Sequence, residues 1–302
     1  MNRISKMLLA FTACALCVAP AIAQDGTLKK IKDNGFITIG HRDASIPFSY
    51  YDDKQQPIGF AMDLCAKIVD AVKANLKMPN LQVKYQLVTS ANRIPLIANG
   101  TVDLECGSTT NNIERQKQVG FTITHFLTAN RYVTKKSAGI KSVDDLKGKT
   151  IVSTSGTTNI KQATELNTAK NMGMNIIPAN GHPEAFQMVE TGRAVAFVMD
   201  DILLYTLVAQ ASNPSDYVIS SDALSLPEPY GIMMHKDDAA FKKVADDAMT
   251  AVYKSGEINK IYAKWFTSPV PPKGINYNVP MSAQFKNLIA NPTSSGDPTV
   301  YK

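Results

Sequence analysis

A run of polar residues from Glu105 to Arg115, written ECGSTTNNIER, is the part of the chain best suited to bind an anion. It follows a buried strand and offers hydroxyl, amide and backbone N–H donors, and Arg115 adds a planar cation one helical turn later. Such a set of donors suits a carboxylate. The same run also fits an ordinary helix start, with Ser108, Thr109 or Asn111 as the N-cap and Arg115 solvated. The run alone leaves both interpretations open.

Helices and strands alternate around this run, which predicts an α/β fold with a mainly parallel sheet. The expected strands are Phe36–Gly40, Leu81–Val88, Val102–Cys106, Thr128–Lys135, Thr150–Ser153, Asn175–Pro178, Ala194–Met199 and Pro229–Met234. The expected helices include Thr27–Asn34, one ending near Leu76, Asn159–Met172, Pro183–Glu190, one from Asp200 to about Ala211, Ala239–Lys254 and Glu257–Phe266. The alternation restarts near Val143, so a second block can bury its own sheet. Crossings near Ala129–Thr134 and Leu226–Met233 would join the two blocks, and the polar tail from Ser294 is expected to fray.

The first residues are typical of an export signal. Arg3 and Lys6 precede an apolar run from Met7 to Val18, which ends in small residues before a cleavage site after Ala23. Removal of residues 1–23 leaves 30 basic and 26 acidic residues, a net charge of +4 that is spread along the chain. The pattern therefore predicts a soluble periplasmic protein, excludes a nucleic-acid binder and fits an anionic ligand.

Cysteine usage indicates an oxidising compartment without a metal centre. Cys14 and Cys17 would leave with the signal, and Cys65 and Cys106 would remain. An exported pair is more often bridged than free, although the sequence does not show that the two residues come within reach of each other. The histidines are far apart and the exported part has no CxxC motif, so we expect neither a metal nor a cofactor.

Several segments together resemble the bacterial solute-binding proteins of polar amino acid ABC transporters, and among them the glutamate/aspartate-binding proteins. They are GHRDASIPFSYYD (Gly40–Asp52), LVTSANRIPLIANGTVDLECGSTTNNIERQ (Leu87–Gln116), TSGTTN (Thr154–Asn159), ETGRAVAFVMDD (Glu190–Asp201) and GEINKIYAKWF (Gly256–Phe266). The resemblance covers nearly the whole mature chain in order and spacing. It implies a monomer with no catalytic activity that passes L-glutamate or L-aspartate to the membrane permease of an ABC importer.

The resemblance also implies a two-lobe type II periplasmic binding protein fold, with the second lobe inserted into the first. Residues 24–130 and 230–302 would form lobe 1 and residues 131–229 lobe 2, with the ligand cleft between the lobes and the two crossing strands as a hinge. Closure of such a hinge over a ligand is a common motion.

Carried over position by position, the ligand site falls on Arg42, Ser90, Arg93, Ser108, Thr110, Arg115, Thr158, His182 and Asp200. A dicarboxylic amino acid requires a single anionic side chain and several cationic or N–H donors. Arg115 and the backbone N–H groups of Thr110 and Thr158 would hold the α-carboxylate. Asp200 would accept the ammonium; its alternative role is to cap the helix that begins beside it, which Asp201 could do instead.

The distal carboxylate would meet Arg42, Arg93, Ser90 and His182, which all follow strands or begin helices. Two arginines at this end favour glutamate over glutamine. A carboxylate close to His182 would favour the protonated ring, so binding should depend on pH.

Other residues keep two interpretations. Phe48 and Tyr50 could form an apolar wall for the ligand or pack within the lobe, and Arg131 could form a hinge salt bridge or a contact behind the site. This chain has Ile232 where the relatives have a cysteine, and it has Cys65 where they have none. Either Cys106 pairs with Cys65 inside the first lobe, or it has lost its partner.

Two further function classes fit the same scaffold. Periplasmic dehydratases resemble these binding proteins, but His182 is the only predicted site residue suited to acid–base catalysis. A soluble ligand-binding sensor would work through a signalling partner. The sensor domain of a membrane receptor would need a transmembrane helix after Lys302, which we do not expect.

Overall fold

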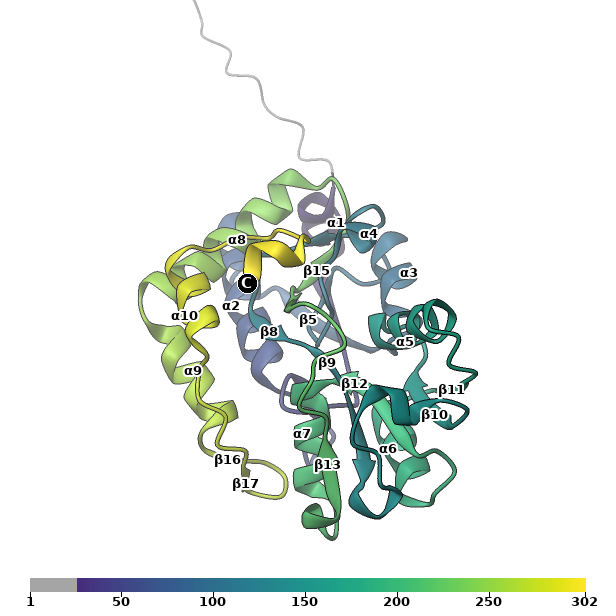
Figure 1. Ribbon diagram of the computed structural model, residues 1–302. Coiled ribbons are helices and arrows are strands. Elements are labelled where there is room, and N and C mark those ends of the chain that lie inside the picture. The colour runs from purple at the N-terminus through teal and green to yellow at the C-terminus, as the bar shows by residue number, and fades with distance from the viewer. Residues whose placement is uncertain (1–25) are drawn as a thin grey trace, which may run out of the picture.

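The computed structural model describes residues 26–302, so the expected export signal at residues 1–23 lies outside the described residues. The described chain forms two five-stranded sheets, each covered by helices, and Figure 1 shows them as an upper and a lower half. None of the helices within 26–302 is long and apolar enough to cross a bilayer.

The first sheet has the strand order β5-β1-β6-β15-β7. Its strands are β5 (Gln82–Leu87), β1 (Phe36–His41), β6 (Leu104–Glu105), β15 (Met233–Met234) and β7 (Gly120–Phe121). The first three run parallel, and β15 runs antiparallel to both of its neighbours. The helices of this half are α1 (Thr27–Asn34), α2 (Phe60–Leu76), α3 (Arg93–Ala98), α4 (Ile113–Gln116), α8 (Ala239–Lys254), α9 (Glu257–Phe266) and α10 (Ala283–Ala290).

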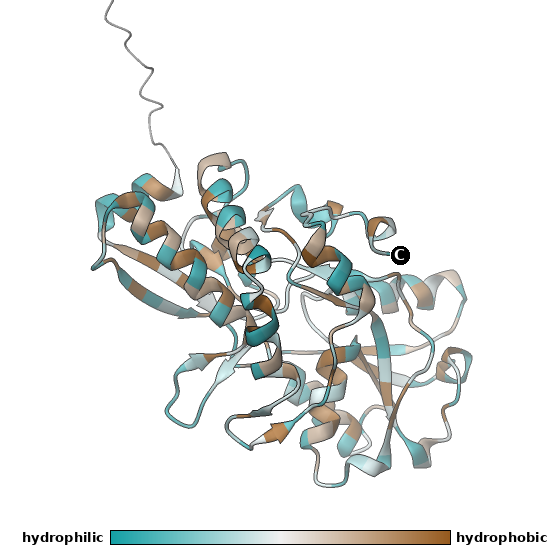
Figure 2. Cartoon of the chain, turned by 90° about the vertical axis from the view of Figure 1, so that its left-hand side faces the viewer, coloured by the Kyte–Doolittle hydropathy of each residue, from teal (hydrophilic) through white to brown (hydrophobic). Residues whose placement is uncertain are grey.

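The apolar spacing of the sequence explains the longest of these helices. Leu64, Ile68 and Val72 recur every fourth residue along α2, and all three side chains are fully buried. Gly35, in the left-handed region, ends α1 as expected. Figure 2 shows hydrophilic and hydrophobic residues mixed along the helices that surround this sheet, as amphipathic helices require.

The second sheet has the order β11-β10-β12-β9-β13 and comes entirely from the middle of the chain. Its strands are β11 (Asn175–Ala179), β10 (Thr150–Thr154), β12 (Ala196–Asp200), β9 (Asn130–Lys135) and β13 (Tyr217–Ile219). The strands β11, β10 and β12 are parallel, and β9 and β13 are antiparallel to their neighbours. The helices of this half are α5 (Thr158–Ala169), α6 (His182–Glu190) and α7 (Asp201–Gln210).

Two crossings connect the halves, as predicted. The expected strand Thr128–Lys135 is divided at Ala129 into β8 (Phe126–Thr128) and β9. On the return, β14 (Glu228–Tyr230) pairs antiparallel with β8, with Pro229 opposite Leu127. The chain can change direction between the sheets because this short pair separates them.

The C-terminal tail is docked, which corrects the expectation that it frays. The hydroxyl of Tyr301 donates to the carbonyl of Ser295 at 2.6 Å, and its ring is buried. The N–H of Thr124 donates to the carbonyl of Thr293 at 2.8 Å, and Asn111 donates to the carbonyl of Ser294 at 3.0 Å. These hydrogen bonds fix the tail beside the start of β8.

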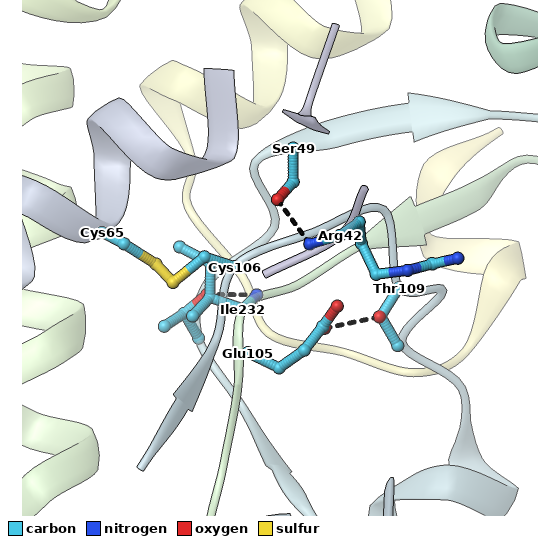
Figure 3. Close-up of a disulfide and its surroundings, with 8 residues drawn as sticks. Arg42, Ser49, Cys65, Glu105, Cys106, Thr109 and Ile232 are labelled. Atoms are coloured by element: carbon cyan, nitrogen blue, oxygen red, sulfur yellow. Dashed lines mark hydrogen bonds between the residues drawn. A yellow bond between two sulfur atoms is a disulfide. The ribbon is translucent and has the colours of Figure 1, made fainter. Parts of the chain in front are cut away.

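A disulfide joins Cys65 on α2 to Cys106, directly after β6, with their Cα atoms 6.2 Å apart. This distance is within the usual range, so the bridged interpretation is confirmed. Figure 3 shows the bond beside Ile232, which is fully buried. Cys106 has therefore re-paired within the first half of the molecule. The bond attaches helix α2 to the strand end from which the polar run begins.

Replacing both cysteines, Cys65→Ala with Cys106→Ala, should lower the free energy of unfolding by about 2–4 kcal/mol, because the bond closes a loop in the unfolded chain. The two residues are 41 apart in sequence. Denaturant titration of the double variant and the oxidised parent measures this difference. An unchanged midpoint would show that the disulfide adds nothing to the stability of the packed strand end.

Candidate functional site

A small cavity lies between the two sheets, with a volume of about 10 Å³, roughly the room that one water molecule needs. Its lining residues are Ser90, Arg93, Ser108, Thr110, Thr157, Thr158, Asn159, His182, Met199, Asp200 and Leu203. Most of them follow the ends of strands from both sheets, where open α/β sheets bind ligands.

Seven of the nine predicted site residues line this cavity, and the other two lie against it. Arg42 is 2% exposed, and its charge acts on the cavity residue His182. Arg115 is 7% exposed and donates to the carbonyl of Thr110 at 2.8 Å. The structure thus brings all nine positions together.

One end of the cavity has buried polar atoms without hydrogen-bond partners among the described residues. The unpaired donors are Ser90 Oγ, Arg93 Nε, His182 Nε2, and Nε and Nη1 of Arg42, and Glu105 Oε1 is an unpaired acceptor behind them. A buried polar group left unpaired costs about 1–3 kcal/mol. All of the donors belong to the four residues predicted to meet a distal carboxylate.

The charges at this end explain the state of His182. Burial, and then the charges of Arg42 and Arg93, hold the pKa of His182 well below its usual value. The ring is therefore neutral without a ligand, and the expectation that a bound carboxylate favours its protonated form stays a prediction. Nδ1 of His182 is 2.9 Å from the hydroxyl of Thr154, which leaves Nε2 for the cavity.

Arg42 and Arg93 differ in how they are held. The backbone N–H of Arg42 donates to Ser49 at 2.9 Å, as Figure 3 shows, and burial and the charge of Arg93 lower the pKa of Arg42 to about 10. The guanidinium remains cationic at neutral pH. Nη1 of Arg93 donates to Thr109 Oγ1 at 2.5 Å and lies 4.0 Å from the carboxylate of Glu105.

Arg115 lies against the other end of the cavity and contacts both halves of the molecule. Its Nη2 donates to the carbonyl of Gly156 across the cavity at 3.2 Å. Oγ1 of Thr110 likewise lies 3.4 Å from Oγ1 of Thr158. Burial and the charge of Arg93 lower the pKa of Arg115 to about 9, so it too is cationic at neutral pH.

Asp200 ends β12 and points into the cavity instead of capping α7, because its side chain makes no cap hydrogen bond. It accepts from Asn159 Nδ2 at 2.8 Å and from the hydroxyl of Tyr230. Burial and the charge of Glu228 raise its pKa to about 7. Asp201 accepts from the Thr128 hydroxyl at 2.6 Å, at the crossing between the halves.

The sequence did not predict Asn159, Tyr230, Glu105 and Glu228 at the site. Asn159 ends the recognised segment TSGTTN, so its position was the only available signal. Glu105 and Glu228 are 0% and 5% exposed, and each accepts from a threonine hydroxyl next to the cavity. Within residues 26–302 Asp200 is the one carboxylate that lines the cavity, and the buried Glu105 and Glu228 lie behind the lining.

The open interpretations of the aromatic residues are settled by burial. Phe48 is 0% exposed and packs against Phe126 and Tyr230, with ring centroids 4.9 and 5.2 Å apart. Tyr50 donates its hydroxyl to the carbonyl of Pro271. Both pack within the fold, and Met199 and Leu203 are the apolar residues of the cavity.

Arg131 forms the predicted hinge salt bridge, with Nε 3.6 Å from Asp201 Oδ2. It also donates to the carbonyl of Ser220 at 2.8 Å. Both contacts lie in the half of the molecule that contains the second sheet, next to the first crossing.

Comparisons with known proteins agree with this arrangement. Residues 37–268 match the family model of the bacterial extracellular solute-binding proteins, family 3. The L-glutamate/L-aspartate-binding protein of Pseudomonas aeruginosa is 56% identical over 295 residues, which cover 96% of this chain and 97% of that protein. The glutamate/aspartate import solute-binding protein of Salmonella typhimurium is 46% identical over 296 residues, covering 96% and 98%.

Solved structures share the fold at lower sequence identity. A mutant of ArgBP from T. maritima has a TM-score of 0.68 and 27% identity, and it covers 79% of this chain and 98% of that one. This likeness confirms the predicted two-lobe fold class.

Proposed function

Because this chain belongs to the bacterial extracellular solute-binding proteins of family 3, we propose that it captures L-glutamate or L-aspartate in the periplasm for an ABC importer. The cluster of unpaired donors at one end of the cavity, on Arg42, Ser90, Arg93 and His182, is the observation that carries the ligand assignment. A second carboxylate on the ligand satisfies these donors, and a neutral side chain does not.

One orientation of the ligand matches the residues around the cavity. Arg115 and the backbone N–H groups of Thr110 and Thr158 hold the α-carboxylate, and Asp200 accepts the ammonium. The side-chain carboxylate then reaches the unpaired donors at the other end, and Met199 and Leu203 flank the methylene groups. The neutral His182 donates through Nε2 when Nδ1 accepts from Thr154. Glutamine would place an amide N–H₂ group against cationic donors, so it binds far more weakly.

Capture occurs by closure of two lobes, residues 24–130 with 230–302 and residues 131–229, around the β8–β14 pair. The contacts of Arg115 and Thr110 with the opposite half support this motion, because an open cleft would break them. The chain works as an exported monomer, with residues 1–23 as its export signal, and its closed form docks on the permease. It is a transport protein and not an enzyme, like the solute-binding proteins that match 96% of its length.

A thermal-shift panel of the twenty amino acids with the mature chain tests this proposal. Ligand at about 100 times its Kd adds about 2.7 kcal/mol of stability to the folded state. L-Glutamate and L-aspartate should therefore raise the unfolding temperature by much more than any other amino acid does. A larger shift with arginine, histidine or glutamine than with either acid would reject the assignment.

A further inference from the structure

A second buried carboxylate lies close to Asp200, on the strand that forms the return crossing. Glu228 is the first residue of β14 and is 5% exposed. One carboxylate oxygen accepts from Gln162 at 2.6 Å, and the other accepts from the hydroxyl of Thr158 at 3.0 Å. Thr158 also faces the Thr110 hydroxyl, so Glu228 fixes a side chain that lines the cavity.

Side-chain hydrogen bonds connect Glu228 to Asp200 through both crossings. Gln162, held by Glu228, accepts from Asn130 Nδ2 at 2.6 Å. Asn130 is the first residue of β9, and its oxygen accepts from Asn159 at 3.0 Å. Asn159 in turn donates to Asp200 at 2.8 Å.

Tyr230 completes a closed ring with β14. Its hydroxyl donates to the second oxygen of Asp200, and it lies two residues after Glu228 on the same strand. Its backbone also forms an isolated bridge with Thr110, another residue of the cavity. This ring of hydrogen bonds therefore connects Glu228 and Asp200 with both crossings and with the cavity residues Asn159 and Thr110.

We propose that Glu228 is a specificity-determining residue, which supplies a second negative charge at the amino end of the cavity and, through the ring, positions Asp200 and Thr158. The proposal deepens the proposed function and rests on it. Two carboxylates at this end favour a ligand with a protonated amine over one without it. Glu228 does this from the hinge strand, outside the lining of the cavity.

The charge of Glu228 affects the protonation of Asp200, which can be measured. The carboxylate of Asp200 faces Glu228 and Tyr230 on β14, Asp201 on α7, Asn159 on α5 and the cation Arg115 on α4. Arg93 and the neutral His182 line the same cavity. The negative charge of Glu228 favours protonated Asp200, and a bound ammonium favours the carboxylate.

The sign of the pH effect follows from these two influences. The pKa of Asp200 is raised to about 7 in the absence of ligand, so part of the population is protonated near neutral pH. Binding an ammonium releases that proton to solvent. Affinity should therefore fall as pH decreases through 7, and Glu228→Gln should move this fall to lower pH because it removes the charge that raises the pKa.

Calorimetry of glutamate binding tests the proposal, at about pH 8.5 and about pH 6 and in buffers of different ionisation enthalpy. At the higher pH, where Asp200 is ionised in both proteins, Glu228→Gln should bind glutamate about tenfold more weakly because one attractive charge is lost. At the lower pH the difference should shrink, and the variant should release fewer protons on binding. Gln162→Met separates the two parts of the proposal, since it breaks the ring at the hydrogen bonds of Gln162 with Glu228 and Asn130 but removes no charge. It should weaken glutamate binding at both pH values and keep the parent pH profile.

The outcomes distinguish a failure of this proposal from a failure of the proposed function on which it rests. Failure of the parent chain to bind either acid at any pH would reject the proposed function itself. Tight binding by the parent with the same pH profile and proton release in Glu228→Gln would reject only the role of Glu228. An equally shifted profile in Gln162→Met would reject the charge of Glu228 as the cause, because the shift would then follow from the hydrogen bonds of the ring.

Discussion

Gly156→Ala is expected to weaken glutamate binding by at least about 100-fold while the chain stays folded. A Cβ atom at residue 156 would lie 2.5 Å from Ala91 Cα and 2.6 Å from the carbonyl oxygen of Ser90, in the opposite half of the molecule. Backbone atoms cannot yield to such an overlap. The two halves would have to stay apart, and Arg115 would lose its hydrogen bond to the carbonyl of Gly156.

A second glycine separates this clash from backbone strain. Gly156 has φ +74, whereas Gly148 has φ +69 and a Cβ atom added there would meet nothing within 4 Å. Gly148→Ala should therefore cost the same stability, about 1 kcal/mol, without a change in affinity. Small-angle scattering at saturating glutamate should show compaction in the parent and in Gly148→Ala but not in Gly156→Ala. Equal affinities in the two variants would show that the contact at Gly156 does not control closure.

Arg42→Met should weaken binding of L-glutamate by about 100-fold and binding of L-glutamine by much less, because it removes a charge that serves only the distal carboxylate. Arg42 is a better position than Arg93 for this substitution, since Nε and Nη1 of Arg42 have no hydrogen-bond partner among residues 26–302. The guanidinium of Arg93 is already bonded to Thr109 and lies near the buried Glu105, so its removal would also disturb the fold. Titrations with both ligands measure the two losses.

The control for this change is Arg193→Met, which removes the same charge from an exposed position in the second half of the chain. It should leave both affinities within about twofold of the parent, because exposed charges are screened. If Arg42→Met lowered the affinities for glutamate and glutamine equally, Arg42 would act on the cavity as a whole and not on the distal carboxylate.

The fold was predictable where apolar spacing reports burial. The period of Leu64, Ile68 and Val72 on α2 and the stop at Gly35 placed elements close to their observed bounds. The division of one expected strand at Ala129 was not predictable, because the chain changes sheets there without a Gly or Pro signal. The docked tail was missed for a similar reason: its hydrogen bonds to Thr124 and Asn111 have no sequence period.

The site was predictable in a different way. The local pattern from Glu105 to Arg115 left two interpretations open, and the resemblance supplied the nine positions that the structure gathers. Neither source indicated Glu228 or Tyr230, which are close to Asp200 only because β14 returns between the sheets. A tertiary contact of this kind, between residues about thirty positions apart, has no local signature. The burial of Phe48 against Phe126 was equally invisible, because a loop rich in aromatic residues fits both packing and binding.

Calorimetric titration of the ligand-free mature chain with L-glutamate and L-glutamine, at one pH and ionic strength, tests the central claim most directly. The two ligands have nearly the same shape and differ in the charge that the donors of Arg42, Arg93, Ser90 and His182 would meet. The account predicts that glutamate binds at least about 100-fold more tightly, since two buried cations face that charge. Equal affinities for the acid and its amide, or no binding of glutamate, would contradict it.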